Sequence, residues 1–296
     1  MIRPKSFDWL VLAFLVITWG SAFAALKIAV AHIPPLWNSA LRLWIAVAAL
    51  AAVAVMRREA LPPLSHPAWR SYAVSGLVGM AAPFTLFAFA AERLPSALNA
   101  ICNGATPIFT ALLAHFLVTG ERLTLRRALG VGLGFCGLLV LVGPLLQGGI
   151  SFEGLGLIAA VGAAGLYATA NIITKQAPLV PSAVGALMMC LWGAVFASVA
   201  ALALGGPPPS PPLSSGLAVL ALGLLPTALA SIGYVFLIQR RGPMFVTMAI
   251  YLAPIWATLV GLVALGERPS WSGYAALALI LGGVAMATLE LRSRPA

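Results

Sequence analysis

The stretch GATPIFTALLAHFLVTGER, residues 104–122, returns in altered form as YLAPIWATLVGLVALGER, residues 251–268. Each copy has a proline inside an apolar run and ends in Gly-Glu-Arg. A glycine then follows each glutamate at the same interval, Gly137 in the first copy and Gly283 in the second. Each half of the chain holds about five apolar spans, an odd number, so the second half must enter a bilayer inverted. Inverted repeats are typical of transporters that expose one central site to either side in turn.

Composition places the chain among α-helical membrane proteins. It is 61% hydrophobic and 8% charged, whereas soluble domains carry about 25% charged residues. Apolar runs of about 20 residues recur along the chain, the length that a helix needs to cross the hydrocarbon. We expect an all-α membrane protein whose two five-helix repeats cover residues 1–149 and 150–296. The ten expected spans are residues 7–31, 36–56, 70–91, 96–118, 127–146, 154–174, 183–204, 214–238, 244–264 and 272–290.

Basic residues predict the orientation of these spans. Lys and Arg accumulate on the cytoplasmic side of membrane proteins, so both termini are expected to be cytoplasmic. The first span is expected to be retained, because its apolar run continues past the signal-peptide-like Ala22-Phe23-Ala24. Only Arg93 and Arg268 fall on the opposite side. The expected cytoplasmic set is Arg3, Lys5, Arg57, Arg58, Arg70, Arg122, Arg126, Arg127, Lys175, Arg240, Arg241, Arg292 and Arg294.

The acidic residues all fall at span ends or in loops. An acid within the membrane is the usual site for a coupling proton or cation, so its absence argues against proton-coupled export of organic cations. Glu121 and Glu267 are expected to fix span ends. Lys27 and Arg42 are the deepest charges. Each is predicted either to reach the outer headgroups along its long stem or to contact a substrate carboxylate.

Four prolines lie near the middle of matched spans: Pro83 and Pro107 in spans three and four, Pro226 and Pro254 in spans eight and nine. A proline inside a helix frees a carbonyl one turn earlier. In a membrane such a group is tolerated against protein or a watery cavity. The prolines are therefore either ordinary kinks within helix packing or gating kinks that line the interior.

Uncharged polar residues gather on these spans and on spans one and six, often in pairs one turn apart. Singly, each can hydrogen-bond a neighbouring helix. As a group, with aromatic rings beside neutral polar groups, they predict a pocket for a small zwitterion with an apolar side chain. The predicted substrate-binding residues are Trp19, Arg42, Thr85, Asn99, Asn103, Tyr167, Asn171, Ser231, Tyr234 and Tyr251.

Other kinds of site find no support in the sequence. The three histidines are isolated, and no serine or cysteine has a recognisable base partner, so we expect no enzyme. The glycine-rich residues 130–134 and 282–283 lack the strand-loop-helix context of a nucleotide site, and they predict close helix packing. No metal or cofactor is expected. The net charge of +10 is spread in small clusters between spans, which excludes a nucleic-acid surface.

The repeated motif resembles a known family. The chain resembles two tandem EamA-type domains of the drug/metabolite transporter superfamily. The resemblance rests on Trp19-Gly20-Ser21, Pro107, Gly120-Glu121-Arg122 and Gly137 in the first half, and on Pro254, Gly266-Glu267-Arg268 and Gly283 in the second. Within it, the chain is similar to the bacterial YddG-type exporters of aromatic and other amino acids. The resemblance implies a ten-helix basket around a central cavity in the bacterial inner membrane. The acidic residue in the first helix of small multidrug relatives has no equivalent here.

The resulting hypothesis is an exporter of amino acids, with aromatic and other apolar ones favoured, and of similar small metabolites, working by alternating access. Its expected partners are the small-molecule substrate and the lipid bilayer. The oligomeric state is left open, with a monomer as one alternative. A drug or other metabolite efflux carrier of the same superfamily is the alternative. An intramembrane enzyme and a non-transporting receptor are disfavoured, by the missing nucleophile and by the inverted repeat respectively.

Overall fold

The structure, a computed structural model, describes residues 6–117, 124–142, 151–241 and 243–288. These residues form helices and connecting turns, with no strand among them. Seven helical segments within them are long and apolar enough to cross a membrane. An all-helical membrane protein was expected, because a helix pairs its own backbone groups where hydrocarbon offers no partner. The ten-span count and the inversion of the halves stay predictions.

The helices of the first half overlap the first five expected spans. The third span is interrupted by a π-helical segment, η1, and the fourth is split into two helices. The elements are α1 (Ser6–Val30), α2 (Pro35–Met56), α3 (Ala68–Gly76), η1 (Leu77–Ala81), α4 (Ala82–Arg93), α5 (Ser96–Asn103), α6 (Thr106–Leu117) and α7 (Leu125–Val142).

The helices of the second half overlap the remaining expected spans in the same way. Again the third span of the half contains a π-helical segment, η2. The elements are α9 (Phe152–Gln176), α10 (Ser182–Leu204), α11 (Leu213–Leu222), η2 (Gly223–Leu229), α12 (Ala230–Arg241), α13 (Pro243–Ala264) and α14 (Trp271–Thr288).

Several helices start where the sequence places a proline. Pro35 is the first residue of α2, while Pro95, Pro181 and Pro212 directly precede α5, α10 and α11. Proline suits this place because the first N–H groups of a helix have no partner within it. α9 begins differently: the Ser151 hydroxyl accepts a hydrogen bond from the third residue along, at 3.1 Å.

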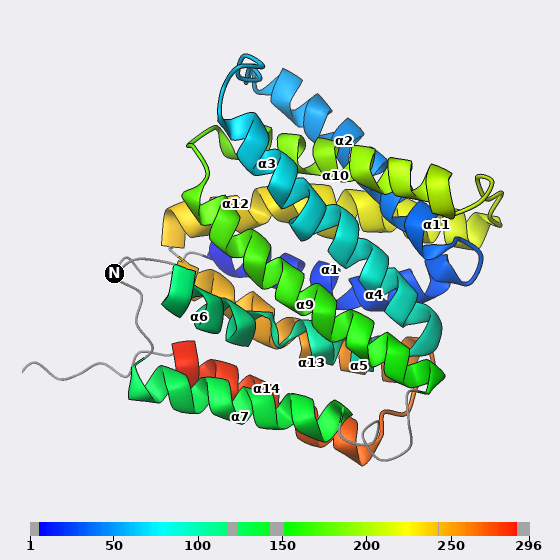
Figure 1. Cartoon of the computed structure of the whole chain (residues 1–296), viewed down its shortest axis with the longest axis vertical. Coiled ribbons are helices and arrows are strands. Elements are labelled where there is room, and N and C mark those ends of the chain that lie inside the picture. The colour runs from blue at the N-terminus through cyan, green and yellow to red at the C-terminus, as the bar shows by residue number, and fades with distance from the viewer. Residues whose placement is uncertain (1–5, 118–123, 143–150, 242, 289–296) are drawn as a thin grey trace, which may run out of the picture.

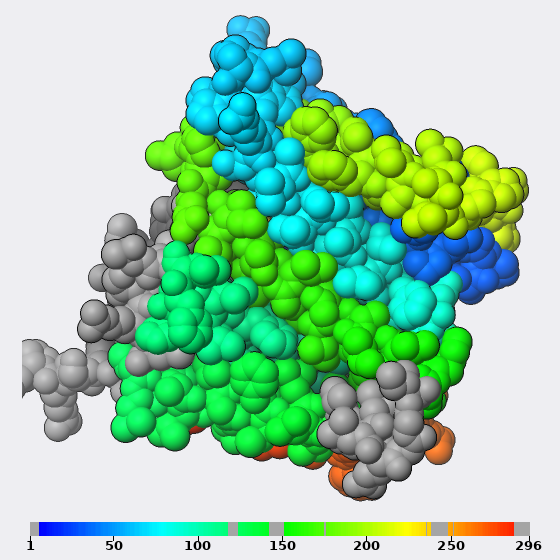
Figure 2. Space-filling view, viewed as in Figure 1, coloured from blue at the N-terminus to red at the C-terminus, as the bar shows by residue number. Residues whose placement is uncertain are grey.

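The helices lie side by side in the arrangement that Figure 1 shows. α2, α3, α10 and α11 are at one end of the long axis, and α7 and α14 form a pair at the other. Between them, α1 lies beneath α4 and α9 and is largely covered by them on the face seen in Figure 2. α1 packs along α13, and α9 packs along α6. Each contact therefore joins the first span of one half to the fourth span of the other half.

Glycines allow α7 and α14 to approach closely. A Cβ added to Gly283 would lie 2.5 Å from the Gly130 carbonyl oxygen and 2.6 Å from the Gly134 nitrogen. A Cβ on Gly137 would lie 2.9 Å from the Ile280 side chain. Small residues at a crossing let backbones meet, which is how membrane helices gain packing contacts. This confirms the predicted packing role for Gly130, Gly134 and Gly283, whereas a Cβ on Gly132 or Gly282 would meet nothing closer than 3.6 Å.

Candidate functional site

Two of the predicted kink prolines accompany π-helical segments in corresponding spans. Pro83 is the second residue of α4, directly after η1, and Pro226 lies inside η2. π turns inside α-helices leave backbone groups without their regular partners and are frequent at functional sites. In η2 the Thr227 hydroxyl satisfies one such group by donating to the Leu222 carbonyl at 2.7 Å.

The other two prolines differ from each other. Pro107 follows a break, since α5 ends at Asn103 and α6 begins at Thr106. Pro254 lies within α13, which continues through it without a break. Thus three of the four prolines accompany an irregular helix. Their role in gating stays a prediction.

Arg42 is a buried cation that joins three elements. It belongs to α2 and is 8% exposed. Its Nε donates to the Thr227 hydroxyl of η2 at 2.8 Å, and its guanidinium carbon lies 3.8 Å from the centre of the Phe84 ring of α4. A guanidinium over an aromatic face is attracted by the ring quadrupole. These contacts fix the direction of the side chain without neutralising its charge.

No carboxylate compensates Arg42 in the described part of the chain. The one ion pair found there within 4.0 Å joins Arg93 to Glu92. The terminal Nη atoms of Arg42 make no hydrogen bond to described residues, yet they are not among the enclosed polar atoms that lack a partner. Arg42 therefore presents two N–H-bearing nitrogens toward accessible space, with no described acid to receive them.

Aromatic rings extend from Arg42 to α1. The Tyr167 ring of α9 lies 6.4 Å from that of Phe84 and 5.6 Å from that of Phe87, centre to centre. Phe87 in turn lies 5.8 Å from Phe23 of α1. The contacts are edge-on or tilted, as aromatic pairs prefer. Tyr167 is thus brought beside the Arg42 site by Phe84.

A second run of contacts returns from α1 to Arg42. Trp19 precedes Phe23 by one turn, so the two share a face of α1. The Trp19 ring lies 6.0 Å from that of Tyr234 in α12. One turn earlier in α12, the Ser231 hydroxyl donates to the Thr227 carbonyl at 2.5 Å. Ring contacts and hydrogen bonds, together with one-turn spacings on α1 and α12, connect the residues that are here named the central cluster: Arg42, Phe84, Tyr167, Phe87, Phe23, Trp19, Tyr234, Ser231 and Thr227.

Asn38 lies one turn before Arg42 on α2, and the two share a helix face. It is 1% exposed, and neither its amide oxygen nor its amide nitrogen has a hydrogen-bond partner. A buried polar group left unpaired costs about 1–3 kcal/mol. In native proteins such groups call for a ligand, a water or a second conformation.

Asn103 and Asn171 belong to a separate polar group. The Asn171 amide of α9 donates to the Thr110 hydroxyl at 3.4 Å. Thr110 donates to the Thr106 carbonyl at 2.9 Å, and the Thr106 hydroxyl donates to the Asn103 amide oxygen at 3.4 Å. The group joins α9 to the α5–α6 break. Asn171 follows Tyr167 of the central cluster by one turn of α9, so the group adjoins that cluster along one helix face.

The remaining predicted residues vary in how they are placed. The Asn99 amide is fully buried and donates to the Phe87 carbonyl at 2.9 Å, which ties α5 to α4. Thr85 is half-buried on α4 and makes no hydrogen bond with described residues. Tyr251 belongs to α13, but its side chain lies outside the described residues, as does Glu121 as a whole.

Lys27 and Glu267 hold the turn between α4 and α5. The Lys27 ammonium donates to the Ala91 and Leu94 carbonyls at 2.7 and 2.8 Å. It therefore pairs a carbonyl of the last turn of α4 and that of Leu94, the residue after it. Its contact with headgroups or with a substrate stays a prediction. Glu267 accepts from the Ser96 backbone and hydroxyl at 2.7 and 2.8 Å. A carboxylate suits a helix N-terminus, so its predicted role at a span end is confirmed.

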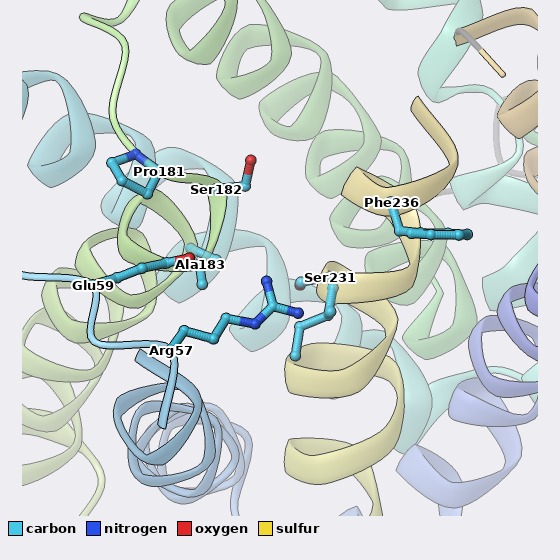
Figure 3. Close-up of a pocket in the computed structure, with 9 residues that line it drawn as sticks. Arg57, Glu59, Pro181, Ser182, Ala183, Ser231 and Phe236 are labelled. Atoms are coloured by element: carbon cyan, nitrogen blue, oxygen red, sulfur yellow. The ribbon is translucent and has the colours of Figure 1, made fainter. Parts of the chain in front are cut away.

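A cavity of about 300 Å³ lies between the end of α2, the start of α10 and α12, and is here named the vestibule. Arg57 and Glu59 line it from the α2 side, Ser182 from α10, and Ser231 and Phe236 from α12. Figure 3 shows the Arg57 side chain extending across it toward Ser231. Because Ser231 also belongs to the central cluster, the vestibule adjoins that cluster.

Comparison with known proteins agrees with this arrangement of helices. The sequence pattern of the EamA-like transporter family matches residues 8–143 and again residues 154–289. The chain belongs to the EamA-like transporter family. Membership of this family indicates a membrane transporter rather than an enzyme. A crystal structure of a protein that is 26% identical, covering 98% of this chain and 100% of its own, superposes with a TM-score of 0.70.

Relatives of this EamA-like chain include named exporters. The aromatic amino acid exporter YddG of Ancylobacter novellus is 30% identical, covering 95% of this chain and 97% of its own. The uncharacterized inner membrane transporter YedA of Escherichia coli is 28% identical over 93% of this chain and 88% of its own. A probable terminal-alkyne amino-acid exporter of Streptantibioticus cattleyicolor is 28% identical over 96% and 92%.

Sequence reasoning missed several members of the site. Thr227 could have been predicted as a site residue, because it directly follows the kink residue Pro226. Asn38 could also have been predicted, since it precedes Arg42 by one helical turn. Nothing in the sequence indicated Phe84 or Phe87, because phenylalanines are frequent throughout apolar spans. Only the folded chain shows which rings meet.

Proposed function

We propose that this chain exports amino acids, with aromatic and other apolar ones favoured, and similar small metabolites across the bacterial inner membrane. Two inverted five-span repeats, residues 1–149 and 150–296, alternate access to the central cluster. The observation that carries the proposal is Arg42, a buried guanidinium without an acidic partner in the described chain.

Arg42 needs an anion. It lies seven residues into α2, about 10 Å along the helix, and a charge held inside a membrane protein is costly and usually functional. Guanidinium binds carboxylates through two parallel hydrogen bonds, and the two Nη atoms of Arg42 are available for this. The α-carboxylate of an amino acid supplies the missing charge during transport.

The surroundings of Arg42 favour an apolar amino acid. The Phe84 ring contacts the guanidinium, and the rings of Tyr167 and Phe87 continue the apolar surroundings from it. Asn38 adds an unpaired amide on the Arg42 face of α2, able to donate to a carboxylate or accept from an ammonium. Ligand sites commonly combine mostly apolar walls with a few placed polar groups. The two relatives named above as amino-acid exporters are compatible with this chemistry.

The helix contacts support the inverted repeat. α2 packs with α10 and α7 with α14, so corresponding spans pair with each other. The contacts α1–α13 and α6–α9 relate in the same way, since each joins the first span of one half to the fourth of the other. A two-fold relation between the halves produces this pattern, and transporters built so rock one part against another around a fixed site.

Counterflow in proteoliposomes tests the function. Vesicles preloaded with unlabelled L-phenylalanine are expected to take up labelled L-phenylalanine and L-leucine in a saturable way, and protein-free vesicles are not. Flux of a lipophilic cation such as ethidium, without flux of any amino acid, would support the drug-efflux alternative instead.

A further inference from the structure

The vestibule carries two opposite charges that do not neutralise each other. Arg57 and Glu59 both line it, yet no nitrogen of Arg57 lies within 4.0 Å of a Glu59 oxygen. One Glu59 carboxylate oxygen is enclosed and has no hydrogen-bond partner. The Arg57 side chain makes no hydrogen bond with the described residues and reaches across the cavity (Figure 3). The space between these groups suits a ligand that has both charges.

The end of α2 fixes this arrangement. Arg58 adopts a left-handed conformation with φ of 56°. Its N–H donates to the Val55 carbonyl at 3.0 Å, and the Glu59 N–H donates to the Ala54 carbonyl at 2.9 Å. This pair of hydrogen bonds defines a Schellman turn, which ends a helix and folds the chain back on it. Arg57 and Glu59 thereby line the vestibule, while the intervening Arg58 is exposed and does not.

We propose that the vestibule is a loading site that holds a free amino acid zwitterion before it moves to Arg42. The proposal rests on the proposed function and assigns it a second, earlier binding site. The Arg57 guanidinium holds the α-carboxylate and the Glu59 carboxylate holds the α-ammonium. Ile232 of α12 and Ala183 and Ala186 of α10 line the same cavity and receive the apolar side chain.

The charges and the size of the vestibule select this chemistry. Glu59 repels a simple anion and Arg57 repels a simple cation, so neither a phosphate nor a lipophilic cation is matched at both ends. The volume of about 300 Å³ is at the lower end of small-molecule sites, and it accepts a single small molecule.

The position of the site gives it a direction. Arg57 is on the side that the basic residues predict to be cytoplasmic. On the inner wall, Ser231 donates to the Thr227 carbonyl, and Thr227 accepts from Arg42. The Ser231–Thr227 turn therefore lies between the cavity that Arg57 lines and the guanidinium of Arg42. An exported amino acid meets Arg57 first and Arg42 second.

Side-dependent kinetics test the loading site. Transport of L-phenylalanine is measured in vesicles of both orientations with wild-type, Arg57→Gln, Glu59→Gln and Arg58→Gln chains. For Arg57→Gln and Glu59→Gln we expect KM to rise about tenfold from the cytoplasmic side, the effect of one lost charge-assisted hydrogen bond. The kcat from the cytoplasmic side is expected to stay within about twofold of wild type. Because a substitution cannot change the transport equilibrium, kcat/KM from the opposite side falls by the same factor, through a lower kcat and not through a higher KM.

Arg58→Gln is the matched control, because it removes the same charge one residue away without touching the cavity. The loading site would be overturned if Arg57→Gln, Glu59→Gln and Arg58→Gln had equal KM values while the wild type transports. The proposed function would then be unaffected. A wild-type chain that moves no amino acid would overturn both. The assay is repeated in vesicles without phosphatidylethanolamine; loss of the Arg57 effect there would mean that a zwitterionic headgroup occupies the site.

Discussion

Arg42 has one hydrogen bond, one aromatic contact and no described acid, so its charge is available to a ligand. We predict that Arg42→Gln raises KM for an amino acid by about ten- to a hundredfold, the worth of hydrogen bonds between charged groups. Arg42→Lys should restore only part of the lost affinity, because an ammonium cannot form the two parallel hydrogen bonds of a planar guanidinium. Transport by Trp44→Phe, a change at an exposed position of the same helix, should equal wild type. An unchanged KM in Arg42→Gln would leave the guanidinium a packing role only.

Glu267 acts on the stability of the fold. It accepts three hydrogen bonds at the start of α5, including one from the Ala97 N–H at 3.3 Å. We predict that Glu267→Gln lowers the thermal unfolding midpoint in detergent, by the loss of about 1–3 kcal/mol, while KM changes little. Glu153→Gln, at an exposed position in the first turn of α9, serves as the control. Equal midpoints for the two variants would contradict the capping role.

At the scale of elements, α7 and α14 offer a matched pair of glycines. A Cβ on Gly283 would meet the backbone of α7 at 2.5 Å, whereas one on Gly282 finds only the Leu133 side chain at 3.6 Å. Gly283→Ala should therefore push the helices apart and cost about 1–3 kcal/mol, as overpacking does. Gly282→Ala should be neutral. The check is the unfolding midpoint of each variant, and a Gly283→Ala protein as stable as wild type would show that the pair tolerates separation.

The elements were largely predictable from the sequence, and the site only in part. Apolar runs locate helices because a lipid-facing backbone must pair within its own segment. Pro83 and Pro226 indicated irregular helices in corresponding spans, where η1 and η2 occur. The partners of Lys27 and Arg42 could not be read in advance. Each meets groups more than 60 residues away in the chain, and which groups meet depends on how the helices pack.

At the scale of the whole molecule, the inverted repeat makes a topological prediction. An odd number of spans in the first half places its end on the opposite side from the two termini. Reporter fusions after Leu146 and after Ala296 should therefore report opposite sides, with the C-terminal fusion cytoplasmic, as the basic residues require. Fusions that report the same side would contradict inversion, and alternating access by two equivalent halves would then have no structural basis.

Counterflow with matched substrates shows whether Arg42 binds the carboxylate of an amino acid during transport. Wild-type and Arg42→Gln chains are compared in proteoliposomes with L-phenylalanine and with phenethylamine, which has the same ring and amine without the carboxylate. We predict saturable flux of phenylalanine through the wild type, a KM for it raised at least about tenfold in Arg42→Gln, and no saturable flux of phenethylamine through the wild type. Equal transport of both compounds by the wild type would mean that the substrate carboxylate is not what Arg42 recognises.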